Sequence, residues 1–320
     1  MLTDRLRADL ERLTGPEPGR LGVAVSGGAD SLALLLLAHG AFPGGVAAAT
    51  VDHGLRPEAG DEAVFVGTVC ERLGCPHAIL RVEVAEGGEG LQGEARRARY
   101  RALAEWAEGQ GIAWLLTAHH SDDQAETILM RLQRGSGLAG LASIRAVRHG
   151  SAAVKVARPL LGWTRAELEA VVEEAGLEAV RDRSNEDERF DRVRMRRFLA
   201  ANPTFEAKRL ARSASALAEA EEALGWAADA AFQARCVFDG DGCRIDPAGL
   251  PRGLRRRLLA QALAEVRTRA AMPPPPREDV ESLLVAAEAG GSATLAGILV
   301  RGGETWTVKP APARRLGRAL

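Results

Sequence analysis

The sequence predicts an α/β protein with a doubly wound parallel sheet and a smaller, mainly helical C-terminal domain. In the first half of the chain, short apolar runs of strand length alternate with helical patterns, as in parallel sheets. The 320 residues exceed the usual size of one domain, and 46% of them are hydrophobic, which suffices for a substantial core. An alanine-rich helical stretch over Thr204–Ala234 opens the second part. We therefore expect domains at residues 1–205 and 206–320.

The elements follow one another in the order that a doubly wound sheet requires. An amphipathic helix over Met1–Leu13 comes first, and Val23–Val25 forms a short buried strand. Apolar runs then predict strands at Gly45–Val51, Ala78–Val84 and Ile112–Thr117, and helical patterns follow Ser31 and cover Glu58–Leu73, Glu94–Gln110 and Thr164–Ala175. Ser26, Asp52 and His119 each stand just past a predicted strand. Because ligands bind beyond the carboxyl ends of such strands, we expect one crevice to gather all three.

The second part of the chain has weaker patterns. The proline run at Pro273–Pro276 predicts a stiff connector. Val280–Ala289 is predicted to be helical, and Ala293–Val308 to form short strands around Gly302-Gly303.

Composition limits the classes of partner and compartment. With 42 Lys and Arg against 43 Asp and Glu, a polyanion would have to be bound by local arginine clusters. The four cysteines, Cys70, Cys75, Cys236 and Cys243, form no C-x-x-C pair, which favours a reducing compartment. No segment resembles a signal peptide or reaches transmembrane length, so we expect a cytoplasmic protein without a membrane partner.

The most informative motif is Ser26-Gly27-Gly28-Ala29-Asp30-Ser31, between the first strand and an apolar helix. The glycines allow a sharp turn and close backbone approach, and a helix N-terminus attracts anions. No lysine precedes Ser31, so this is not the usual phosphate loop of nucleotide triphosphatases. The alternative is a glycine turn that binds nothing.

Two further clusters follow predicted strands. Asp52-His53-Gly54-Leu55-Arg56 offers an acceptor for ribose or adenine and cations for phosphates, or is simply a polar turn. Asp123 and Glu126 are three residues apart and share one helix face, where they can hold a divalent cation or a substrate ammonium, or cap an acidic helix N-terminus. Zinc held by His119, His120 and Asp123 is disfavoured, because adjacent histidines rarely face one ion.

Each arginine cluster alone is typical of a solvated face, but several clusters in a chain of near-zero net charge predict a polyanionic partner. Arg131 and Arg134 lie beside the flexible loop Gly135–Gly140, which suits a contact to phosphate. The other clusters are Arg96, Arg97, Arg99 and Arg101 beside Tyr100; Arg189, Arg192, Arg194, Arg196 and Arg197; and Arg252 with Arg255–Arg257.

The order of these motifs resembles the tRNA(Ile)-lysidine synthetase family of the ATP pyrophosphatase (PP-loop) superfamily. The Ser26–Ser31 loop is common to the superfamily, and the later blocks are more particular. Those blocks are Asp52–Arg56, Ala95-Arg96 with Arg99-Tyr100, Asp123 with Glu126-Thr127, Arg131, Arg134–Gly137, Arg158–Leu161, and Asp182 with Ser184-Asn185. The resemblance covers the first domain well and the second mainly in size and helical opening. Gln92, where a carboxylate is usual, and Val193, inside an expected Arg-Asn-x-Ile/Val-Arg segment, depart from the family pattern.

The resemblance implies an adenine nucleotide alpha hydrolase-like fold and a two-step ligation. ATP adenylates the C2 carbonyl oxygen of the wobble cytidine in tRNA(Ile) with a CAU anticodon, and the ε-amine of free L-lysine then displaces AMP to give lysidine. A homodimer is compatible with this resemblance. The implied roles are ATP binding by Ser26, Gly27, Gly28, Ala29, Asp30, Ser31, Asp52 and His53; Mg²⁺ at Asp30; catalysis by Asp30, Asp123 and Glu126; and substrate binding by Arg99, Asp123, Glu126, Arg131, Arg134, Asp182, Arg194 and Arg196.

Three alternatives remain open. A tRNA thiolase of the same superfamily needs cysteine pairs that the spacings here do not provide. A small-molecule amide synthetase would leave the arginine clusters without a role. A non-catalytic RNA-binding protein with a vestigial nucleotide site would not be expected to keep the whole loop intact.

Overall fold

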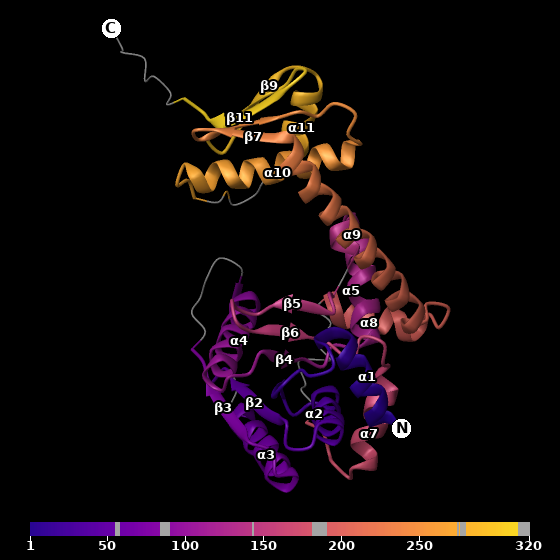
Figure 1. Ribbon diagram of the computed structural model, residues 1–320. Coiled ribbons are helices and arrows are strands. Elements are labelled where there is room, and N and C mark those ends of the chain that lie inside the picture. The colour runs from indigo at the N-terminus through magenta and orange to yellow at the C-terminus, as the bar shows by residue number, and fades with distance from the viewer. Residues whose placement is uncertain are drawn as a thin grey trace. The chain divides into compact units, whose positions relative to one another are not determined.

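The computed structural model describes residues 1–54, 58–83, 90–142, 144–180, 191–273, 275 and 280–312. Two compact units divide the chain, Met1–Glu219 and Ala220–Leu320 (Figure 1). The division falls inside helix α9 (Ala207–Arg235), whereas the expected boundary at residue 205 precedes this helix.

The first unit contains a six-stranded sheet in the order β3-β2-β1-β4-β6-β5 (Figure 1). All neighbouring strands are parallel except β5 and β6, which pair antiparallel. The chain builds outward from β1 to β3 and then returns to place β4 on the other side of β1, which confirms the predicted doubly wound sheet. The strands are β1 (Leu21–Ala24), β2 (Val46–Asp52), β3 (His77–Arg81), β4 (Trp114–Leu116), β5 (Val147–His149) and β6 (Lys155–Ala157).

Helices cover both faces of this sheet. One apolar core joins the strands to α1 (Leu2–Thr14), α2 (Ala29–Ala41), α3 (Glu58–Leu73) and α7 (Arg165–Glu174), and a second core joins them to α4 (Gly90–Gly109). Small residues allow close packing here: a Cβ on Gly22 of β1 would lie 2.9 Å from Cζ3 of Trp106 in α4. The remaining helices of this unit are α5 (Ser121–Gln133), the short α6 (Leu138–Leu141) and α8 (Asp191–Ala201).

The start of α7 ties three helices together. Thr164 and Glu167 form a capping box, in which the Thr164 backbone N–H donates to Glu167 Oε2 at 2.7 Å. Glu167 also pairs with Arg5 of α1 at 2.9 Å and with Lys208 of α9 at 3.2 Å. Burial alone would raise the pKa of Glu167, but the Thr164 amide and the two cations outweigh it and lower that pKa to about 2.

The second unit combines helices with an antiparallel sheet in the order β7-β8-β11-β10-β9. The strands within Ala293–Val308 agree with the prediction, but the β7–β8 hairpin, which turns at Gly240 with φ +56°, was not predicted. Pro274 and Pro276 of the proline run lie outside the described residues. The elements are β7 (Cys236–Asp239), β8 (Gly242–Ile245), α10 (Arg252–Arg269), α11 (Val280–Glu288), β9 (Ser292–Leu295), β10 (Ile298–Arg301) and β11 (Trp306–Pro310).

Within the described part of the chain, none of the helices combines the length and apolar composition that crossing a membrane requires.

Packing between β10 and α11 leads to the first prediction. A Cβ on Gly302 would overlap the carbonyl oxygen of Ala287, so Gly302→Ala forces the backbone of this unit apart. We expect the free energy of unfolding to fall by about 1–3 kcal/mol, measured by urea denaturation of the full chain. The control is Gly225→Ala in α9, where a Cβ meets nothing within 4 Å. This change should leave stability the same or raise it slightly. An equal loss in both variants would contradict the packing explanation.

Candidate active site

A polar hollow of about 220 Å³ opens beside the point where the strand order reverses, between β1 and β4. In doubly wound sheets this is the usual position of a ligand. The lining residues come from the segments after β1 and β4 and from α4, α5 and α8: Ala24, Ser26, Gly28, Asp30, Ser31, Arg96, Arg99, Thr117, Ala118, His119, Asp123 and Arg192.

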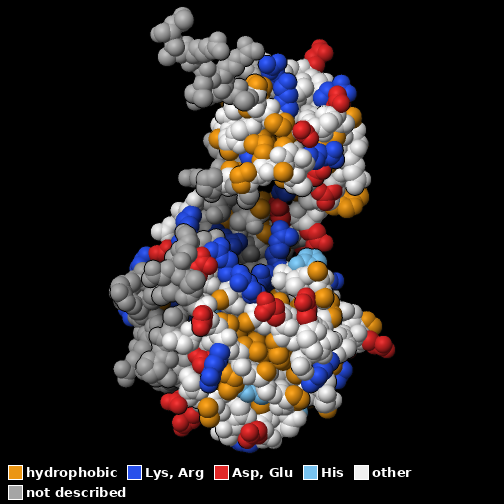
Figure 2. Space-filling model, turned by 90° about the vertical axis from the view of Figure 1, so that its left-hand side faces the viewer, with side chains coloured by type: hydrophobic (Ala, Val, Ile, Leu, Met, Phe, Trp, Pro, Cys, Tyr) orange, Lys and Arg blue, Asp and Glu red, His pale blue; other side chains and the backbone are white. Residues whose placement is uncertain are grey.

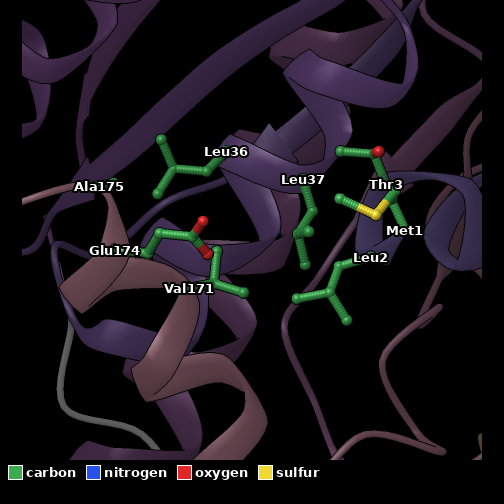
Figure 3. Close-up of a pocket in the computed structure, with 8 residues that line it drawn as sticks. All are labelled: Met1, Leu2, Thr3, Leu36, Leu37, Val171, Glu174 and Ala175. Atoms are coloured by element: carbon green, nitrogen blue, oxygen red, sulfur yellow. The ribbon is translucent and has the colours of Figure 1, made fainter.

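A second pocket, of about 320 Å³, differs in character (Figure 3). Leu2 of α1, Leu36 and Leu37 of α2 and Val171 of α7 face one another there, and the polar side chains in its lining are Thr3 and Glu174. Such walls suit an apolar group rather than a charged substrate. The polar hollow is therefore the candidate active site.

Hydrogen bonds of its two serines stabilise the loop after β1. The backbone N–H of Ser26 donates to Ser31 Oγ at 3.1 Å, the two hydroxyl oxygens lie 3.2 Å apart, and Ser31 Oγ donates to the Gly28 carbonyl at 2.9 Å. Gly27 has φ +84°, which few other residues adopt, and a Cβ there would lie 3.2 Å from Cγ2 of Val180. The fold therefore needs a glycine at position 27.

Gly28 has a different role from Gly27. It is the N-cap of α2 with φ −71°, and no side chain caps this helix, so the N-terminus of α2 is available to a ligand. A Cβ on Gly28 would meet only Ser26 Oγ, at 3.7 Å. The fold tolerates a side chain at this position, but that side chain would enter the hollow. The loop is therefore built to receive an anion.

His120 is fully buried and stands among three carboxylates. Its Nε2 lies 3.4 Å from Asp30 Oδ2 and 3.6 Å from Asp123 Oδ2, and its Nδ1 lies 3.3 Å from Asp122 Oδ2. Burial lowers the pKa of His120, but the carboxylates outweigh burial and raise it to about 10, so the ring is an imidazolium at neutral pH. The Asp122 N–H is also 3.3 Å from Nδ1, but an imidazolium has no lone pair there, so we take the carboxylate as the partner.

The pKa values of the surrounding groups follow from the same cluster. Burial would raise the pKa of Asp30, but His120 outweighs burial and lowers it, and Asp122 is lowered to about 2 in the same way. His119 is the opposite case. Burial and the nearby Arg158 lower its pKa to about 2, so it is neutral, with Nδ1 lying 3.1 Å from the Thr117 hydroxyl.

Asp123 and Glu126 clamp α8 onto α5. Glu126 is only 1% exposed; its Oε2 accepts from Arg192 Nε at 2.7 Å and its Oε1 from Arg196 Nε at 2.8 Å. Asp123 accepts from Arg192 Nη2 at 2.5 Å and from the His120 backbone N–H at 3.0 Å. The two carboxylates share one helix face as predicted, and Arg192 bridges them.

Several predicted site residues lie outside the lining of the hollow. Asp52 accepts from the Gly54 backbone N–H at 2.9 Å, and burial followed by the charge of Arg99 lowers the pKa of the adjacent His53. The predicted substrate arginines bond within the protein: Arg131 to the Gly140 carbonyl, Arg134 to Asp191 at 2.6 Å, Arg194 to Asp191 and Arg196 to Glu126. Asp182 and Arg56 lie outside the described residues, as does the side chain of Gln92.

Of the three residues expected in one crevice, Ser26 and His119 line the hollow and Asp52 does not. The hollow also gathers Arg99 and Asp123 as predicted, and it adds two arginines to which the predicted site gave no role, Arg96 and Arg192. The pair His119-His120 after β4 was visible in the sequence. That one ring is neutral and the other charged depends on partners distant in the sequence. The individual roles of the predicted site residues stay predictions.

Comparison with known proteins agrees with this geometry. Residues 2–202 match the PP-loop domain family. The chain is 42% identical to the tRNA(Ile)-lysidine synthase of Zymomonas mobilis over 95% of its own length and 92% of the relative's. It is 44% identical to that of Novosphingobium aromaticivorans over 98% and 95%. A solved U34-tRNA thiolase from Methanococcus maripaludis, with its [4Fe-4S] cluster, has a similar fold at TM-score 0.54 and 18% identity, covering 68% of this chain and 79% of that one.

The clamp between α5 and α8 leads to the second prediction. Glu126→Gln keeps the side-chain size but removes the buried charge that both arginines contact. We expect the free energy of unfolding to fall by about 1–3 kcal/mol in urea denaturation. The matched control is Glu173→Gln at an exposed position of α7, which should change stability by less than about 0.5 kcal/mol. A similar change in the free energy of unfolding for both variants would show that the contacts of Glu126 with α8 do not stabilise the fold.

Proposed function

Because the chain belongs to the tRNA(Ile)-lysidine synthase family of PP-loop proteins, we propose that it is a ligase that forms lysidine. The reaction joins lysine to C2 of the wobble cytidine in tRNA(Ile) with a CAU anticodon and consumes ATP. The observation that carries this proposal is the polar hollow, which has an anion-binding loop on one side and the Asp123 carboxylate on the other.

The loop suits the phosphates of ATP. The N-terminus of α2, the hydroxyl of Ser26 and the guanidinium groups of Arg96 and Arg99 line the hollow, while the Ser31 hydroxyl donates to the Gly28 carbonyl within the loop. These donors can hold the pyrophosphate as it leaves, when its negative charge grows. Asp52 and His53 lie at the end of the neighbouring strand, where they can contact the ribose or the adenine.

Mg²⁺ fits the hollow only together with ATP. Asp30 is an ionised carboxylate, 36% exposed, at the start of α2. Across the described residues, no group of three or more His, Cys, Asp and Glu side chains is arranged to hold a metal. Mg²⁺ commonly takes one or two carboxylates and completes its shell with phosphate oxygens and water. When bound, the ion would offset phosphate charge, with Asp30 as its protein ligand.

Asp123 is the carboxylate that lysine would meet. Asp123 lines the hollow, although it also accepts from Arg192 and from the His120 N–H, whereas Glu126 does not line it. Both oxygens of Glu126 are bonded to Arg192 and Arg196. We therefore assign the substrate ammonium to Asp123, and to Glu126 the positioning of the two arginines beside it. The attacking ε-amine must be unprotonated, whereas a carboxylate partner favours the charged form, so Asp123 suits the α-ammonium of lysine rather than its ε-amine.

The RNA must present an unpaired cytidine to the hollow. Single-stranded loops expose their bases in this way, and arginines hold the backbone. Arg131, Arg134, Arg194 and Arg196 stay our candidates for such contacts. We propose that the protein acts in the cytoplasm, where tRNA is modified, and a homodimer would appear as a mass of two chains in solution.

A thiolase is less well supported. Relatives matched over nearly the whole chain are lysidine synthases, and the likeness to the thiolase concerns the fold. None of the four cysteines is among the residues that line the hollow.

The third prediction tests the function directly. The purified chain is incubated with ATP, Mg²⁺, labelled L-lysine and a tRNA(Ile) transcript with a CAU anticodon. We expect lysine to enter the RNA with release of one pyrophosphate for each lysine. Omitting ATP or tRNA should abolish both, and omitting lysine should limit pyrophosphate release to the single adenylation step. A transcript with uridine at the wobble position is the control and should stay unlabelled. Repeated pyrophosphate release in the complete mixture without lysine transfer to RNA would refute the proposal.

The fourth prediction concerns the loop. Gly28→Val should lower kcat/KM for ATP by about a hundredfold or more, because its side chain enters the space of the phosphates. The melting temperature should change little, since the backbone there suits other residues. Gly109→Ala at the far end of α4 adds a Cβ that meets nothing within 4 Å and should keep full activity. If Gly28→Val had the same kcat/KM for ATP as the parent, the nucleotide would have to bind elsewhere.

A further inference from the structure

We propose that a groove beside α4 carries the phosphodiester backbone of the substrate RNA next to the target cytidine, an inference that rests on the proposed function. We call it the α4 groove. It has a volume of about 510 Å³ and lies between α4 and the β5–β6 hairpin. Its lining includes Arg96, Tyr100, Arg101, Glu105, Glu108 and Arg148.

Two guanidinium groups stack on one aromatic ring in this groove. The Arg148 guanidinium carbon lies 3.9 Å from the centroid of the Tyr100 ring, and that of Arg96 lies 5.2 Å from it. Arg148 comes from β5, far from Tyr100 in the sequence. Its Nε and Nη2 are buried and have no hydrogen-bond partner among the described residues. Buried donors without acceptors are costly, so an acceptor from a ligand would complete this arrangement.

More positive charge lies behind the ring. Arg158 is only 4% exposed; its Nη1 donates to the Arg145 carbonyl at 2.5 Å, and its Nε has no partner among the described residues. Burial raises the pKa of Tyr100, but Arg96 and then Arg158 outweigh burial and lower it. Of the ion pairs between described residues, none joins Arg96, Arg148 or Arg158 to a carboxylate. A polyanion would relieve the mutual repulsion of these three charges.

The α4 groove is continuous with the active site. Arg96 lines both the groove and the polar hollow, and Arg99, one turn along α4, lines the hollow. β3, the strand before α4, has its carboxyl end on the same side of the sheet as the hollow. Arg96 and Arg99 therefore lie at that end of α4. Glu105 and Glu108 line the other end of the groove. In Figure 2, Lys and Arg side chains gather on the first unit near the middle of the view.

This charge gradient indicates the path of the RNA. A strand whose nucleotide enters the hollow would pass its next phosphates over Arg96, Arg148 and Arg101, and would leave the groove before the two glutamates. The phosphates of ATP have their own donors in the Ser26–Ser31 loop. The α4 groove therefore provides a second place for phosphate, between α4 and the β5–β6 hairpin.

The test is the salt dependence of tRNA binding by Arg148→Gln, measured on the full chain with the CAU tRNA(Ile) transcript. We expect a several-fold weaker affinity, and a plot of log K against log salt whose slope is smaller by about one counterion. The KM for ATP should be unchanged. Arg72→Gln is the matched control, because Arg72 is exposed at the end of α3, at the opposite edge of the sheet. This control should bind RNA like the parent.

The outcomes separate this inference from the proposed function. The parent chain is first shown to transfer lysine to tRNA, and a failure there counts against the function alone. If the parent is active, an unchanged tRNA affinity and an unchanged salt slope for Arg148→Gln would overturn the proposal that the groove binds RNA. A raised KM for ATP with unchanged RNA binding would also overturn it, since the groove would then hold nucleotide. If Arg148→Gln does not fold, Arg101→Gln at the exposed edge of the groove gives the same readout.

Discussion

The buried imidazolium of His120 is the contact on which the site depends. Through Asp30 it holds the start of α2, and through Asp123 it holds the start of α5. The third carboxylate, Asp122, accepts from the backbone N–H of Arg165 at 3.1 Å and so reaches the first residue of α7. One charged ring thus fixes the starts of three helices relative to one another. Removing its charge would leave three carboxylates close together without the cation that offsets their mutual repulsion.

The ion pairs of Glu126, next to this cluster, show the same arrangement with the charges reversed. The His120 ring is a cation surrounded by carboxylates, and Glu126 is a carboxylate surrounded by the cations of α8. Asp123 belongs to both, since it contacts His120 on one side and Arg192 on the other. Asp123 therefore links the contacts that position α2 to those that position α8. This coupling gives a physical reason for the active site to lie at the place where three helices begin.

The sequence predicted the parts of the structure that depend on local patterns. The apolar runs located β1 to β4, and the glycine and serine spacing located the loop. It missed β5 and β6, because strands of three residues that contain Arg148, His149 and Lys155 show no apolar run. It also missed β7 and β8, although Asp239-Gly240 between two short apolar runs is a hairpin signal, because each of these strands has only four residues. Periodicity carries little signal for such short or mixed elements.

For the site too, the sequence predicted only what depends on local spacing. Asp123 and Glu126 were found from their spacing, but their partners stand 66 to 70 positions later in the chain, and no local pattern reports such a pair. Arginines that look alike in the sequence differ for the same reason. Arg192 and Arg257 are neutralised by carboxylates, whereas Arg96 and Arg148 stack on a tyrosine. A formal net charge of -1 hides this difference. What a polyanion meets is the local excess that remains after pairing, and only the folded chain determines where that excess lies.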